Sequence, residues 1–173
     1  MNIRSLFKRL TLFPSLLRTS VESVDDAEAR FRPETQAWSI VEILGHMLDE
    51  ERDDFRPRLR STLEDPQQPW AAIDPPTAVR EHGHQDASKS TLLEAFCKER
   101  HASLQWLEEN LERTASDWDR TYKHPSLGAL RAGDLLLSWV NHDHLHMRQI
   151  GLRLYQLSLR DGEPYVCDYA GPP

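Results

Sequence analysis

Four stretches of the chain repeat apolar residues at three- and four-residue steps, which is the period of an α-helix. They cover residues 1–29, 40–63, 90–113 and 132–157, and most of the prolines lie between or after them. No segment alternates polar and apolar residues convincingly enough to indicate a strand. The pattern therefore predicts an all-α fold, a four-helix bundle with a long loop, residues 65–88, between its second and third helices.

Local signals refine two of these helices. Ser39 and Glu42 have the spacing of a capping box, in which each side chain satisfies a free backbone donor, so the second helix should begin at Ile40. Pro14 should either kink the first helix or mark its start, because proline cannot donate a backbone hydrogen bond. Pro57 is placed to bend the second helix.

Length and charge limit the classes of function. A chain of 173 residues suits one domain, which we expect to span 1–173 with a bundle core at about 5–157 and a tail at 158–173. The chain carries 21 Lys and Arg against 28 Asp and Glu, a net charge of −7, which argues against a nucleic-acid partner. No apolar run approaches the roughly 20 residues of a membrane span, and residues 1–17 lack the pattern of a signal peptide. We therefore expect a cytoplasmic protein with no membrane partner.

The cysteines and glycines exclude several common sites. Cys97 and Cys167 are far apart and outside any CxxC motif, which excludes a disulfide framework and a cysteine-rich zinc knuckle. No glycine-rich loop of the phosphate-binding kinds is present.

The fourth helix carries two histidines on its apolar line. That line runs through Leu135, Trp139, Ile150, Leu154 and Leu157. His142 and His146 fill its two polar positions and are four residues apart, so both rings can reach one metal ion. His144 lies about 200° from His142 around the helix and should not join them. The alternatives are core histidines held by hydrogen bonds, or a solvated stripe.

The other histidines are less clearly placed: His46, His82, His84, His101 and His124. Pattern alone puts His46 on a flank of the second helix, one turn before Glu50. His82 and His84 lie in the long loop, where we expect solvent exposure.

Three motifs resemble the DinB/YfiT-like superfamily. The segment 38–51 resembles its "WS…E-I-L-x-H-L…E" motif, and Arg32-Pro33 just upstream resembles its "R-P". The segment 124–128 resembles "H-P-x-x-G", and 139–150 resembles "W-x-x-H-D-x-x-H-x-x-Q-I". Their order and spacing extend the likeness over nearly the whole chain.

The resemblance implies a divalent ion held by three histidines, one from the second helix and two from the fourth. Matched residue by residue, these are His46, His142 and His146. We expect zinc or nickel, because imidazole suits both ions and the site contains no cysteine. The ion lowers the pKa of a bound water or thiol, so we expect either a metal-dependent hydrolase or a transferase that uses a low-molecular-weight thiol on a small-molecule substrate. The alternative is a non-catalytic metal-binding protein, structural or stress-associated.

Three nearby polar residues have weaker expectations. Glu50 is a candidate base one turn from His46, and Gln149 is a candidate polar neighbour of His146. Asp143 is expected to be exposed, or to orient a helix neighbour. The motifs assign no catalytic residue.

The second helix is apolar over a wide arc: Val41, Ile43, Leu44, Met47, Leu48, Phe55 and Leu59. A bundle helix normally buries one stripe, so the excess apolar surface favours a homodimer. The alternative is that the N-terminal segment or the 65–88 loop covers this second face within one chain.

Overall fold

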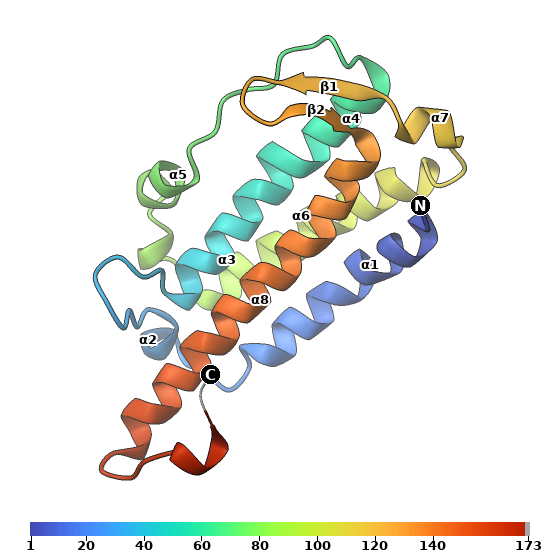
Figure 1. Cartoon of the computed structure of the whole chain (residues 1–173). Helices are drawn as coiled ribbons and strands as arrows, with labels where there is room; N and C mark the ends of the chain where they lie inside the picture. Colours follow the sequence, from blue (N-terminus) through green and yellow to red (C-terminus); the bar gives the residue numbers. More distant parts are fainter. Residues whose placement is uncertain (172–173) are drawn as a thin grey trace.

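The computed structural model describes residues 1–171 of the chain. Four long helical segments form a bundle, and shorter elements lie at its ends and along one side (Figure 1). In chain order the elements are α1 (Ile3–Ser20), α2 (Asp26–Ala29), α3 (Ile40–Asp49), the π-helix η1 (Glu50–Phe55), α4 (Arg56–Glu64), α5 (Pro75–Glu81), the 3₁₀-helix η2 (His84–Asp86), α6 (Lys89–Glu109), α7 (Ala115–Trp118), β1 (Thr121–His124), β2 (Gly128–Arg131), α8 (Ala132–Gly162) and the 3₁₀-helix η3 (Asp168–Ala170).

The first and second long helical segments lie diagonally across the bundle from each other, and so do the third and fourth. Helix α1 packs against α6 and α8, and α3 also packs against α6 and α8. The hairpin of β1 and β2 lies at the same end of the bundle as the N-terminus, and α2 lies at the other end (Figure 1). The predicted four-helix bundle is therefore present. Within residues 1–171, no helix is both long and apolar enough to cross a membrane.

The second long segment begins where its capping box predicts. The Ser39 backbone N–H donates to Glu42 Oε2 at 2.9 Å, and the Glu42 N–H donates to Ser39 Oγ at 3.4 Å. The segment continues through α3, η1 and α4 to Glu64, with a π-helical stretch in its middle. Pro57 follows this stretch and lacks the N–H that a regular helix would need there. Such π-helical turns occur frequently at functional sites.

Pro14 lies inside α1, which continues through it and ends at Ser20, short of the predicted end at residue 29. Because Pro14 has no N–H, the carbonyl of Leu10 loses its helical donor. The Nη1 atom of Arg100, from α6, donates to that carbonyl at 3.3 Å. A tertiary contact thus replaces the local hydrogen bond that the sequence removes.

Other helix ends also differ from the predicted ones. A separate helix, α2, follows α1 because Asp25 caps it, accepting from the Glu28 N–H at 2.8 Å. Helix α6 begins at Lys89 with Ser88 as its cap, and α8 extends to Gly162, beyond the predicted end at residue 157.

The predicted 65–88 loop and the connection between α6 and α8 both contain regular structure. Residues 121–131 form an antiparallel hairpin in which Thr121 pairs with Arg131 and His124 pairs with Gly128. Gly128 has a φ of +77°, which glycine adopts without strain. Strands of four residues are too short for a detectable alternation, which is why the sequence pattern missed them. The 65–88 loop contains α5 and η2.

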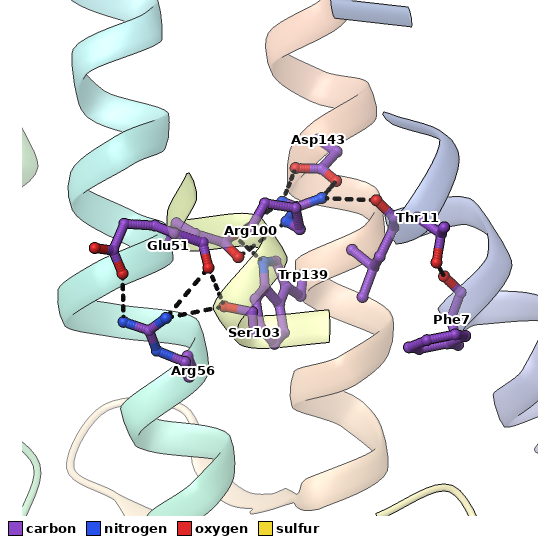
Figure 2. Close-up of polar contacts among 10 residues, drawn as sticks. Phe7, Thr11, Glu51, Arg56, Arg100, Ser103, Trp139 and Asp143 are labelled. Atoms are coloured by element: carbon purple, nitrogen blue, oxygen red, sulfur yellow. Dashed lines mark hydrogen bonds and ion pairs between the residues drawn. The ribbon is translucent and has the colours of Figure 1, made fainter. Parts of the chain in front are cut away.

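A buried polar layer divides the apolar core. On α6, Phe96 belongs to one apolar cluster and Leu107 to another, and Arg100 lies between them. Arg100 extends between Glu51 of η1 and Asp143 of α8 (Figure 2). Asp143 is 3% exposed, so the alternative that it lies at the surface is wrong, and its partner is Arg100 of the neighbouring helix α6. Its partner could not be found from the pattern, because Arg100 is 43 residues away.

Helix α3 is buried on every side. All of its residues from Ile40 to Asp49 are buried, and it contacts α5 and η2 as well as α6 and α8. The 65–88 loop therefore covers the second apolar face within one chain. The argument for a homodimer from excess apolar surface on this helix is wrong, although self-association itself stays a prediction.

Candidate metal centre

Three histidines from two helices meet inside the bundle. His46 comes from α3, and His142 and His146 come from α8. The Nε2 atom of His142 lies 3.2 Å from Nε2 of His46 and 2.9 Å from Nε2 of His146. One nitrogen from each of the three rings lies within 4.8 Å of the others, which is close enough to share one ion.

The packing of α3 against α8 creates this convergence. The four-residue spacing in α8 directs His142 and His146 to one side, while His144 is exposed. His46 is 5% exposed and faces α8, although the pattern of its own helix placed it on a flank. Because α3 is buried on all sides, its flank faces the interior as well.

Burial keeps the imidazoles neutral. Burial, followed by the charge of the neighbouring His146, lowers the pKa of His46 to about 3 and that of His142 to about 2. Burial also lowers the pKa of His146, although a hydrogen bond with Gln149 partly opposes this. Neutral imidazoles at pH 7 carry the lone pairs that a metal ion requires.

One hydrogen bond fixes the tautomer of His146. Its Nδ1 atom lies 2.7 Å from the amide oxygen of Gln149, which can only accept. The proton is therefore on Nδ1, and the lone pair of Nε2 faces the other two rings. Gln149 thus has the role of a polar neighbour that the sequence suggested, and this donor set fits a divalent ion.

A pair of buried carboxyl groups adjoins His46. Glu50 Oε1 lies 3.7 Å from His46 Nδ1, and Glu50 is 8% exposed. Burial, then the charge and hydrogen bond of Asp54, raises the pKa of Glu50 to about 8. Asp54, whose pKa is also raised by burial, pairs with Arg58 at 3.0 Å. Glu50 is therefore mainly protonated at pH 7.

Sequence reasoning found Glu50 but missed Asp54 and Arg58. With His46 they recur every fourth residue, at 46, 50, 54 and 58, along one side of the helix. That spacing is a signal the sequence contains, although surface ion pairs at this spacing are also common.

A cleft borders this polar row. It has a volume of about 440 Å³, and its lining includes Asp54, Arg58, Trp70, Tyr122 and His124. The indole of Trp70 stacks on Tyr122 with ring centroids 3.8 Å apart, and the Arg58 guanidinium lies 4.9 Å from the Trp70 ring. The volume is typical of small-molecule sites. Neither this cleft nor a larger cavity of about 530 Å³, beside Trp118 and Asp134, is lined by any of the three histidines, and the cleft is linked to them through Asp54 and Glu50.

Loop histidines do not join the three-histidine cluster. His84 is 6% exposed and contacts Asp49, so the prediction that His84 is exposed to solvent is wrong. The His82 side chain is 43% exposed and contacts the same carboxylate. His84 is buried because its ring packs against the backbone of Gly45 in α3. His101 is exposed and His124 lines the cleft.

The chain is similar in fold to a solved structure. This is YfiT from Bacillus subtilis, described as "a probable metal-dependent hydrolase with an unusual four-helix bundle topology". The TM-score is 0.77 at 19% sequence identity, and the alignment covers 92% of this chain and 87% of that one. A search of curated proteins found no match. The model of the DinB superfamily matches residues 9–150, which is most of the chain. The protein therefore belongs to the DinB superfamily.

Proposed function

We propose that this protein binds one divalent metal ion, zinc or nickel, through His46, His142 and His146. The observation that carries the proposal is the convergence of three ring nitrogens from two helices, on rings that burial keeps neutral. Two of these contacts, at 2.9 and 3.2 Å, join nitrogen to nitrogen. A proton can bridge only one such pair at a time, so a cation satisfies the three lone pairs better.

We further propose that the protein uses this ion in an enzymatic reaction on a small molecule. A divalent ion held by neutral imidazoles lowers the pKa of a bound water or thiol, which suits hydrolysis or thiol transfer. Glu50 holds a proton on its carboxyl group beside His46 and can exchange it with Asp54, which lines the cleft. Arg58 and the stacked pair of Trp70 and Tyr122 form the cleft wall that would orient a substrate.

Aromatic rings limit the access of water to the histidines. Trp38 lies against His46 with ring centroids 4.9 Å apart, and Phe55 lies against His142 at 5.0 Å. Phe55 also stacks on Trp139, with ring planes 6° apart. A partly dehydrated site strengthens electrostatic effects on a bound nucleophile.

The first experiment measures metal content. Untagged wild-type protein should contain metal bound at the three histidines, and His142→Ala should lose that metal. His144→Ala is the matched control, because its side chain lies on the same helix but is exposed. Equal metal content in the two variants would contradict the ligand assignment.

The second experiment tests catalysis. Wild-type and His142→Ala proteins are assayed on small esters and amides, and on electrophiles with added low-molecular-weight thiols. Metal-dependent turnover of either set supports an enzyme and separates hydrolysis from thiol transfer. No turnover, together with a large loss of stability on chelation, would favour the structural alternative.

A further inference from the structure

We propose that Asp49, His82 and His84 form a second site for a divalent transition metal such as zinc. Asp49 Oδ2 lies 2.9 Å from His82 Nδ1 and 2.7 Å from His84 Nε2. One donor atom from each of the three residues lies within 4.8 Å of the others. Two imidazoles and one carboxylate are a ligand set that zinc and other transition metals accept. This site shares no ligand with the three histidines described above.

Glycine at position 83 lets both histidines point to one carboxylate. His82 follows the last residue of α5, and His84 begins η2. Between them Gly83 adopts a φ of +65°, a conformation that other residues rarely adopt. The chain therefore turns sharply enough for residues two apart to present their rings to the same oxygen atom.

Glycine at position 45 makes room for one of the rings. A Cβ atom at Gly45 would lie 2.1 Å from Cγ of His84. Gly45 is inside α3, where glycine costs about 1 kcal/mol relative to alanine. The helix thus contains a poor helix-forming residue at the point where the His84 ring approaches its backbone. Two glycines in separate segments are both required to build this cluster.

The carboxylate is arranged to bind a cation. Burial alone would raise the pKa of Asp49, but hydrogen bonds from His84 and His82 lower it, so the group is ionised at neutral pH. Its other oxygen, Oδ1, accepts from Arg52 Nη2 at 3.2 Å. Oδ2 is therefore left to the two rings. The Arg52 contact orients the carboxylate, and its positive charge should also moderate the affinity for metal.

Exposure differs between the two histidines in a way that suits a reversible site. The His84 side chain is 7% exposed, whereas that of His82 is 43% exposed. Solvent can thus reach the cluster from the His82 side and complete the coordination of an ion. Such an ion would fix α5 and η2 to α3, one turn from His46. Metal binding here would therefore control the order of the 65–88 loop.

The test titrates metal alone into untagged, metal-free protein in a His142→Ala background, which removes the three-histidine site. We expect one equivalent of zinc to bind, measured by calorimetry and by metal analysis. His142→Ala/His82→Ala should weaken this binding at least tenfold. His142→Ala/His101→Ala is the matched control, because His101 is also an exposed histidine, and it should bind as the parent does. His82 is the residue to replace, since its exposed ring contributes little to the fold.

Two results would overturn the proposal. One is the absence of a zinc equivalent in the folded His142→Ala protein, and the other is unchanged binding when His82 is also replaced. Either result would mean that Asp49 and the two histidines only form hydrogen bonds that hold the 65–88 loop against α3. Neither result bears on the three-histidine site, whose test compares the metal content of His142→Ala with that of wild-type protein and His144→Ala. As a second measurement, zinc should slow proteolysis within residues 65–81 in the His142→Ala background, and not when His82 is also replaced.

Discussion

Replacing Arg100 with methionine removes the cation on which the polar layer of the bundle depends. Arg100 donates four hydrogen bonds to Glu51 and Asp143, at 2.8 to 2.9 Å. The side chains of Arg100, Glu51 and Asp143 are only 1%, 1% and 4% exposed. Trp139 Nε1 donates a further bond to Glu51 at 2.9 Å (Figure 2). In Arg100→Met, two buried carboxyl groups lose their cation.

The expected loss is about 4 kcal/mol of unfolding free energy at pH 7.5. Breaking a buried ion pair from one side typically costs about 3–5 kcal/mol. The four bonds do not add up to more, because a carboxylate left without its cation takes up a proton. Burial already raises the pKa of Asp143 in the intact protein, which makes this response accessible. The Leu10 carbonyl also loses its donor, since Pro14 cannot supply one.

Urea unfolding of metal-free protein, followed by circular dichroism, measures this loss. Arg4→Met is the control: it breaks an ion pair with Glu112 whose side chains are 72% and 82% exposed, so we expect a loss below about 1 kcal/mol. Arg100→Lys keeps the charge but not the planar fork, and should lose an intermediate amount. If Arg100→Met does not fold, the loss of unfolding free energy measured for Arg100→Lys tests the same reasoning. A loss below about 1 kcal/mol for Arg100→Met, equal to that of Arg4→Met, would refute the reasoning.

Four further predictions concern the site and its surroundings. Between pH 7.5 and 5.5 the metal-free Glu50→Gln protein should lose about 3 kcal/mol in urea unfolding, because unfolded histidines gain protons near pH 6.5 while His46 and His142, with pKa values of about 3 and 2, do not. The Glu50→Gln background is needed because the raised pKa of Glu50, about 8, stabilises the folded wild-type protein as pH falls and opposes this loss. Constant stability of Glu50→Gln over this range would contradict the burial of the two histidines as neutral rings. Glu50→Gln should change unfolding free energy by less than about 1 kcal/mol at pH 7, because a pKa of about 8 keeps Glu50 protonated, and should lower any measured turnover at least 100-fold. Gly45→Ala should destabilise the protein by about 1–2 kcal/mol, because the added methyl group clashes with the His84 ring. Gly151→Ala should stabilise it by up to about 1 kcal/mol, because a methyl group there meets no described atom within 4 Å. Thermal unfolding that ranks the two variants the other way would refute this. If the protein forms a homodimer, exposed leucines of α1 and α8 are one surface that it could use. Leu145→Glu should then shift sedimentation to a folded monomer near 20 kDa, and an unchanged dimer would exclude that face.

Sequence alone determined the features that depend on neighbours within one helical turn. The apolar period placed the four long helices, and the Ser39 and Glu42 spacing placed the start of the second one, because a capping box closes over three residues. The four-residue step of His142 and His146 likewise fixed their common face. Family resemblance, not periodicity, selected His46 as their partner.

Tertiary structure decided everything that joins distant residues. The apolar pattern of α3 could not say that the 65–88 loop covers its second face, since that depends on α5 and η2 packing against it. Nor could it pair Arg100 with carboxylates 43 and 49 residues away. His84 was predicted to be exposed because loop residues usually are, yet Gly45 opens a place for its ring on α3. Periodicity reports which side of a helix is apolar, whereas only the packed chain determines what lies against each side.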